Sequence, residues 1–361
     1  KIMRHFNNSI RTAFIVLLSV FVFGSCQQDQ YSAEITEMAG EEIAVLRDNK
    51  NNIRANIAVS IGNNMYKLMV NDTNQLHFPT TLEEYSKTNT KHANPFMYPW
   101  GNRLEGYYYY FNDQKISVDT TIPSLYFQRD DNNLPLHGYM TKIDAWETVS
   151  YQASNENGAT HTAKIDFSDH PRLMKNYPFP HIVTMKHTLK DGTVSVQVTV
   201  ENTGDKAMPV AYGFHTYYKI PPMDSHDNYL TIPAKKYMEL DDRFLPTGEL
   251  TDIFNLVSDP RHYKIGTKKI DNIFTQLNTN ENDYSMFSLE KPNRTINIQM
   301  GKNYQYATVY SPIEEGTSFV CVEPMMAPTN AFNLYHKEKW DHLPIVQPGE
   351  TQQSTFKIAL Q

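Results

Sequence analysis

The chain has 361 residues, of which 40% are hydrophobic and 20% are charged, and its formal net charge is −7. This composition is typical of a folded globular protein and argues against a disordered or fibrous chain. The acidic balance and the lack of a basic cluster argue against nucleic acid as a partner. The 23 tyrosines and 18 phenylalanines, against 15 glycines, favour strands with aromatic surfaces, which suit the stacking of sugar rings.

The N-terminal segment has the pattern of a secretory signal. Basic residues precede an apolar run at residues 13–23, and Phe23-Gly24-Ser25-Cys26 resembles a bacterial lipobox. The run is shorter than the ~20 apolar residues that a membrane-spanning helix needs, so a permanent transmembrane helix is the weaker interpretation. We therefore expect residues 1–25 to be a signal peptide, with cleavage before Cys26 and attachment of lipid to its thiol.

The mature protein is then expected outside the cytoplasm, anchored by its lipid to a bacterial membrane, in the periplasm or at the outer membrane. Residues 26–40 comprise the lipidated cysteine and a polar tether. Loss of Lys1, Arg4 and Arg11 with the leader changes the formal charge from −7 to −10. Cys321 is the only other cysteine, so no intrachain disulfide can form and the core must hold the fold.

From about Glu41 onward, apolar and polar residues alternate with the period of two that is typical of half-buried strands. The alternation is clear at residues 53–59, 194–200, 296–300 and 356–360, and Asp191-Gly192 predicts a hairpin turn after the strand HIVTMKHTL. The best helix candidate is a short turn near TTLEEYSK with Thr81 as its cap. The sequence therefore predicts one all-β domain over residues 41–361, mostly antiparallel, with few short helices.

Four short stretches combine polar and aromatic residues beyond what packing requires, at residues 98–106, 134–140, 212–218 and 319–333. In SFVCVE, Cys321 and Glu323 share a strand face. Pro324 is expected to stop the ladder and to leave the Glu323 carboxylate at a strand end, where it can meet a ligand. The alternative is an exposed or ion-paired glutamate at a sheet rim.

The other stretches hold ionisable residues whose roles stay open when each is taken alone. His215, in GFHTY, is expected on the same strand face as Tyr217, yet a lone histidine among aromatic residues is more often a packing residue than a catalyst. His137 precedes a glycine that suits a simple turn. Arg103 offers fixed donors for vicinal hydroxyls or a carboxylate, but it could equally be a surface charge.

In chain order these stretches resemble the aldose 1-epimerase (galactose mutarotase) family, along nearly the whole mature chain. The matching motifs are Asn102-Arg103, Leu136-His137-Gly138 with Trp146, Gly213 to Tyr217, Leu245 to Glu249, and Val322-Glu323-Pro324 before Asn330 to Asn333. The resemblance implies a large twisted antiparallel β-sandwich with an open sugar cleft. It also implies interconversion of the α and β anomers of free aldohexoses of the galactose or glucose type, with no metal or organic cofactor.

By motif, Glu323 corresponds to the family's general base and His215 to its general acid. Their ordinary pKa values, ~4.3 and ~6.5, suit these roles. The resemblance makes Arg103 and His137 sugar ligands, and we expect Asn102 and Tyr217 beside them at the substrate. The family's sugar-binding aspartate is assigned to Asp271 in preference to Asp241 or Asp242, which precede the LPTGE motif.

Two features of the motifs leave questions open. The family usually has Gly-x-His-Pro-Tyr-Phe, whereas Thr216 and Tyr218 stand here, so the backbone after His215 is less restrained and the substrate preference is not fixed. Trp100, Trp146 and the nearby tyrosines are either stacking surfaces for a sugar or, as is commoner at strand ends, part of the core.

Two other functions compete with the mutarotase. A carbohydrate-binding lipoprotein of the same fold, without turnover, would bind sugar tightly and leave anomerisation unaccelerated. A mutarotase for hexose phosphates would need clustered basic residues at the cleft, and only Arg103, Lys142 and Lys219 lie near the motifs.

Overall fold

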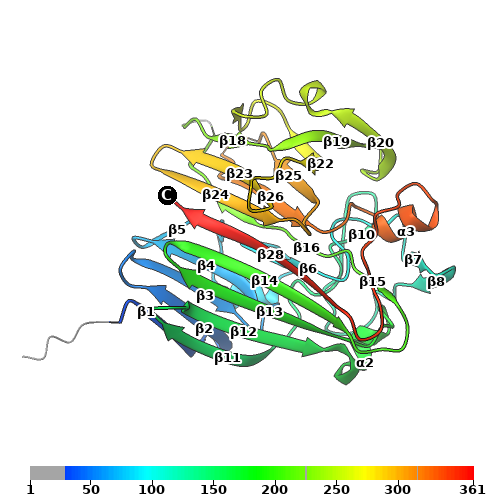
Figure 1. The fold of residues 1–361 in the computed structure, drawn as a ribbon, viewed down its shortest axis with the longest axis horizontal. Coiled ribbons are helices and arrows are strands. Elements are labelled where there is room, and N and C mark those ends of the chain that lie inside the picture. The colour runs from blue at the N-terminus through cyan, green and yellow to red at the C-terminus, as the bar shows by residue number, and fades with distance from the viewer. Residues whose placement is uncertain (1–28, 224–225, 315) are drawn as a thin grey trace, which may run out of the picture.

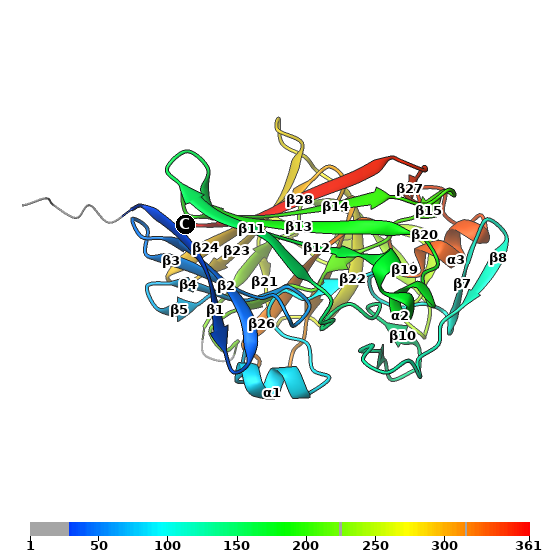
Figure 2. The same cartoon turned by 90° about the horizontal axis from the view of Figure 1, so that it is seen from below.

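The structure is a computed structural model that describes residues 29–223, 226–314 and 316–361. Two large antiparallel sheets form its body, and a smaller sheet from the N-terminal part of the domain packs beside them (Figures 1 and 2). The predicted signal peptide and Cys26 lie outside the described residues. No helix within the described ranges is long and apolar enough to cross a membrane.

The first large sheet has nine strands, and the long central ones carry the predicted alternation. Val194, Val196, Val198 and Val200 are fully buried on one face. Asp191 and Gly192 both have positive φ, as the predicted tight hairpin between the third and fourth strands requires. In spatial order the strands are β11 (Glu147–Ser154), β12 (Gly158–Asp166), β13 (His181–Lys190), β14 (Thr193–Asn202), β28 (Thr351–Leu360), β24 (Arg294–Gly301), β23 (Tyr284–Lys291), β18 (Tyr229–Thr231) and β21 (Tyr263–Lys264).

The second large sheet has eight strands and carries most of the predicted site residues. In spatial order they are β20 (Pro246–Asp252), β19 (Ala234–Leu240), β22 (Ile270–Leu277), β25 (Tyr306–Ser311), β26 (Phe319–Met325), β16 (Gly213–Phe214) and β6 (Phe96–Met97), and β17 (Tyr217–Lys219) also pairs with β26. Val320 and Val322 of β26 point into the main core, which this sheet shares with the nine-stranded sheet. Cys321 and Glu323 alternate with them and therefore lie on the opposite face.

The N-terminal sheet corrects one boundary predicted from the sequence. Its strands are β1 (Tyr31–Met38), β2 (Glu41–Asp48), β3 (Ile53–Ala58), β4 (Asn64–Val70) and β5 (Thr73–Asn74). The prediction of a tether over residues 26–40 is wrong for β1, which pairs with β2 along its whole length. The strand is polar because it lies at a sheet edge, so its order comes from the ladder and from the buried Tyr31 rather than from a strong alternation.

The remaining elements are short and connect or cover the sheets. The predicted helix near TTLEEYSK is confirmed, since Thr81 and Glu84 form a capping box at its start. The helices are α1 (Leu82–Lys87), α2 (Pro171–Met174) and α3 (Ala331–His336), with 3₁₀ turns at Phe167–Asp169 and Ile253–Asn255. Three two-stranded ladders pair β7 (Tyr108–Phe111) with β8 (Gln114–Ser117), β9 (Gln128–Arg129) with β10 (Pro135–Leu136), and β15 (Met208–Pro209) with β27 (Ile345–Val346).

Candidate active site

Glu323 lies within β26 and not at its end. The expectation that Pro324 stops the ladder is wrong, because β26 continues to Met325, with Pro324 opposite Ala307. A proline lacks only the N–H donor, so its carbonyl can still take part in pairing. The Glu323 side chain is only 2% exposed, which makes it a buried carboxylate in the middle of a sheet and not a residue of the rim.

His215 meets Glu323 directly. It lies between β16 and β17, where its backbone N–H donates to the carbonyl of Pro95 at 3.1 Å. Its Nε2 is 3.3 Å from Oε1 of Glu323, and the His215 side chain is 9% exposed. Among the described residues, neither Nδ1 of His215 nor Oε2 of Glu323 has a hydrogen-bond partner. Buried polar atoms rarely stay unpaired, so these atoms are suited to contact a polar ligand.

The surroundings favour the uncharged forms of both groups. Burial, with a further contribution from Asp271, raises the pKa of Glu323 well above its usual value, and Lys91 and Arg103 partly oppose the rise. Burial, with help from the positive charge of Lys91, lowers the pKa of His215 well below its usual value. A carboxyl group with a raised pKa next to an imidazole with a lowered one is an arrangement that can pass a proton in either direction.

His137 and Tyr217 flank this pair. The His137 ring lies 5.0 Å from the His215 ring, centroid to centroid, and the Tyr217 ring stacks on His215 at 4.4 Å, so the expected shared face of His215 and Tyr217 is confirmed. His137 is buried and has a left-handed backbone with φ of 62°. A Cβ on the next residue, Gly138, would come within 2.0 Å of the Tyr98 carbonyl oxygen. Only glycine therefore lets the loop lie close enough to aim His137 at His215.

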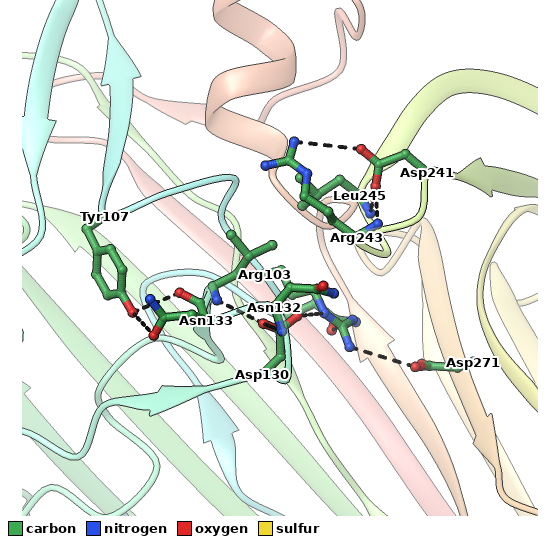
Figure 3. Close-up of polar contacts among 11 residues, drawn as sticks. Arg103, Tyr107, Asp130, Asn132, Asn133, Asp241, Arg243, Leu245 and Asp271 are labelled. Carbon is green, nitrogen blue, oxygen red and sulfur yellow. Dashed lines mark hydrogen bonds and ion pairs between the residues drawn. The ribbon is translucent and has the colours of Figure 1, made fainter.

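Arg103 lies between the carboxylates of Asp130 and Asp271 (Figure 3). Its Nε donates to Oδ2 of Asp130 at 2.7 Å, and its Nη2 is 3.9 Å from Oδ2 of Asp271. Its Nη1 donates to Oδ1 of Asn102 at 3.2 Å. The Asn102 amide in turn reaches the Thr308 hydroxyl at 3.4 Å, and Thr308 is the direct neighbour of Glu323 in the ladder. These contacts hold the guanidinium in a fixed orientation beside the buried pair.

The structure brings Asp271 into the site and places Asp241 elsewhere. Asp271 lies on β22, and burial raises the pKa of its carboxyl, opposed by Arg103. The Asp241 carboxylate accepts hydrogen bonds from the backbone of Arg243 and Leu245 and so closes a turn (Figure 3). Of these two aspartates Asp271 is the one whose carboxylate contacts Arg103, and its role as a sugar ligand stays a prediction.

Two other sequence motifs have structural roles. Asn330, in the Asn-Ala-Phe-Asn motif, donates its backbone N–H to the carbonyl of Arg103 at 2.9 Å and so braces the loop that carries the guanidinium. The Leu245 to Glu249 motif forms the start of β20, and Glu249 is exposed there. Trp100 and Trp146 are buried and pack against core aromatic residues, which agrees with the alternative that they are part of the core.

Two residues of the site were missed by sequence reasoning. Asp130 follows β9 and orients Arg103, and its other oxygen accepts the backbone N–H groups of Asn132 and Leu134. Lys91 interacts electrostatically with Glu323, His215 and His137, and burial lowers its own pKa to about 7. Both residues stand outside the recognisable motifs, and only tertiary pairing brings them to the site.

The position of Lys91 follows from the backbone next to it. The carbonyls of Pro95 and Ala93 accept the N–H groups of His215 and Tyr217, at 3.1 Å and 2.7 Å. Residues 93–95 therefore run antiparallel to residues 215–217, and Lys91 lies two residues before this pairing. An ammonium group beside a buried carboxylate favours its ionised form and disfavours protonation of nearby imidazoles.

Comparison with known proteins gives one consistent result. A galactose mutarotase-like protein from Clostridium acetobutylicum matches this fold with a TM-score of 0.78 at 17% identity, covering 92% of this chain and 99% of that chain. Galactose 1-epimerase from Lactobacillus acidophilus NCFM matches with a TM-score of 0.69 at 14% identity, covering 92% and 98%. These likenesses confirm the predicted fold.

Sequence comparison extends the result from fold to family. The uncharacterised protein YihR of Escherichia coli K12 is 25% identical over 245 residues, which is 67% of this chain and 72% of YihR. The sequence pattern of aldose 1-epimerases matches residues 44–359, a span that holds every candidate site residue described above. The chain belongs to the aldose 1-epimerase family.

Proposed function

We propose that the protein is a mutarotase that interconverts the α and β anomers of free aldohexoses. The observation that carries this proposal is the buried contact of 3.3 Å between His215 and Glu323. Membership of the family supports a sugar as the substrate. Arg103, His137 and Asp271 lie around the pair and supply the donors and acceptors that sugar hydroxyls need.

Ring opening uses the pair in its ionic form, with Glu323 as carboxylate and His215 as imidazolium. Glu323 removes the proton of the C1 hydroxyl, while the His215 imidazolium gives one of its two N–H protons to the ring oxygen. The C1–O5 bond breaks with its electron pair going to O5, and the electrons released from the O–H bond form the carbonyl of the open-chain aldehyde. The enzyme is left with a neutral carboxyl and a neutral imidazole, which are the forms that burial favours.

Ring closure is the reverse process on the other face of the carbonyl. Rotation about the C1–C2 bond turns that face toward the C5 hydroxyl. Neutral His215 accepts the hydroxyl proton as O5 attacks C1, and Glu323 returns its proton to O1. The protein regains its starting charges, so turnover exchanges no net proton with solvent. Residues 102, 103 and 137 would hold the remaining hydroxyls while the bond rotates.

Polarimetry tests the proposal. The protein from residue 27 onward should accelerate the relaxation of freshly dissolved α-D-glucose or α-D-galactose, and His215→Asn should reduce the rate by about 10²- to 10⁴-fold. A matched control is His342→Asn, because the His342 side chain is 63% exposed whereas that of His215 is buried. Tight binding of the sugar without faster mutarotation would contradict the proposed activity and favour a carbohydrate-binding protein.

Lys91 gives a second prediction, on the pH dependence of turnover. Its positive charge lowers the pKa values of Glu323, His215 and His137, so Lys91→Met should raise all three. Both limbs of the pH–rate profile should then move to higher pH, by about one unit. Lys91→Arg should restore the wild-type profile, and Lys186→Met, on the exposed face of β13, should leave it unchanged. An unshifted profile in Lys91→Met would exclude this role.

Lipidation at Cys26 and residence outside the cytoplasm are part of the same proposal, and the lipobox-like sequence supports them. Growth with a labelled fatty acid should label the protein, and Cys26→Ser should abolish the label. Label retained in that variant would contradict the anchor.

A further inference from the structure

A second pocket lies apart from the acid–base pair. It has a volume of about 520 Å³ and is formed by the β4–β5 turn, the segment after β17 and the β23–β24 turn. None of its lining residues belongs to the group around His215 and Glu323. Lys219, at the end of β17, lies at its edge two residues beyond Tyr217.

The pocket is cationic. Lys219, Lys291 and Arg294 line it, and no aspartate or glutamate does so among the residues that the structure describes. Within the same described ranges, no carboxylate forms an ion pair with any of these three side chains at 4.0 Å or less. Positive charges gathered without acidic partners repel one another, and such a cluster is costly unless an anion binds it.

Lys291 is held in place at the centre of this cluster. Its Nζ donates to Oε1 of Gln75 at 2.8 Å and to the carbonyl of Lys219 at 3.2 Å. An ammonium group has three donors, so one stays available for a ligand. Burial, with Arg294 and Lys219, lowers the pKa of Lys291 to about 8, which is the direction expected for a cation that lacks an anion.

The walls of the pocket indicate what accompanies the anion. Pro221, Pro222, Pro292 and Ile220 give it rigid apolar surfaces next to the cations. A pyranose ring has apolar C–H faces, and an acidic sugar adds a carboxylate or sulfate group at its edge. A volume of about 520 Å³ lies in the range of pockets that enclose small organic ligands, and exceeds the need of a bare ion.

We propose that this pocket binds a saccharide that carries an oxyanion, either a carboxylate or a sulfate ester, through Lys219, Lys291 and Arg294. Binding here is separate from the acid–base chemistry of His215 and Glu323 and goes beyond it. Charge-assisted hydrogen bonds from the cations would fix the oxyanion, and the proline walls would contact the ring.

Calorimetric titration with methyl glycosides tests the pocket independently of turnover, because a methyl glycoside has no free C1 hydroxyl and cannot mutarotate. Methyl β-D-glucuronide or methyl glucoside 6-sulfate should bind at least about tenfold more tightly than neutral methyl glucoside. The glycoside that binds more tightly shows whether the pocket prefers a carboxylate or a sulfate ester. Lys291→Gln and Arg294→Gln should each weaken that binding by about tenfold and leave mutarotation unchanged.

Lys186→Gln is the matched control, since it removes one positive charge from an exposed position on β13, a strand that contributes no residue to the pocket lining. It should leave the affinity unchanged. Equal binding of neutral methyl glucoside, equal binding of inorganic sulfate, or unchanged affinity in both pocket variants would overturn the proposal. If the protein binds the acidic glycoside but does not mutarotate any aldose, the pocket proposal stands and the mutarotase proposal fails. If it mutarotates aldoses but does not bind the acidic glycoside, the mutarotase proposal stands and the pocket proposal fails.

Discussion

Glu323→Gln is expected to abolish mutarotation, with a rate loss of about 10²- to 10⁴-fold, and to raise the unfolding temperature at neutral pH. Glutamine keeps the shape of the side chain but cannot accept the C1 hydroxyl proton. The same substitution also removes a carboxyl whose ionisation burial opposes, because that burial raises the pKa of Glu323 well above its usual value of 4.5. Activity and stability should therefore change in opposite directions.

The sign of the pH dependence follows from that shift. A carboxyl whose pKa is higher in the folded than in the unfolded state contributes stability below pH 4.5 and loses it as the pH rises toward the folded pKa. The gain in unfolding temperature should therefore be larger at pH 8 than at pH 4. Thermal unfolding at both pH values, beside polarimetry, measures the two effects.

A second glutamate in a family motif provides the control for this experiment. Glu249 is exposed on β20. Glu249→Gln should retain activity and show no gain that grows with pH. Full activity in Glu323→Gln would show that Glu323 is not the base. A gain in stability that is the same at both pH values would show that the buried charge of Glu323 does not cause the gain.

His187→Leu is expected to stabilise the protein in acid much more than in base. His187 lies on β13, is fully buried, and neither ring nitrogen has a hydrogen-bond partner among the described residues. Burial, together with the neighbouring His161, lowers its pKa from 6.5 to about 3. The unfolded chain therefore takes up a proton below pH 6.5 that the folded chain refuses, and the wild type loses stability as the pH falls from 6.5 to 3.

The expected magnitude comes from the proton linkage of this one residue. At pH 5 the linkage penalty of His187 is about 2 kcal/mol, and at pH 8 it vanishes. Urea unfolding at the two pH values should show the stabilisation by leucine to be larger at pH 5 by about that amount. His342→Leu, at an exposed histidine, is the matched control for loss of an imidazole. An equal gain at both pH values would show that better packing, and not proton uptake, is the cause.

The candidate site could be predicted from the sequence where a side chain and its local backbone suffice. His215 shares a face with Tyr217 because strand residues alternate. Asp271 and Arg103 were both expected at the sugar, and their side chains come within 3.9 Å of each other. The prediction that β26 ends before Pro324 was wrong, because β25 and β16 pair with β26 on its two sides and the strand continues through the proline. Glu323 is therefore deeply buried, and the shift of its pKa depends on that burial.

The sequence by itself determined the class of the fold and the hairpin at Asp191-Gly192, and it singled out His215 and Glu323 as candidates for the acid and the base, because alternation, turn chemistry and short motifs are local properties of a chain. Tertiary structure alone decided that β1 joins the domain, that Asp130 orients Arg103 and that Lys91 lies beside the pair. It also gathered Lys219, Lys291 and Arg294 around one pocket. Each of these depends on pairing between segments far apart in the chain, where contacts across the fold, and not local preference, set the burial and the electric field of a side chain.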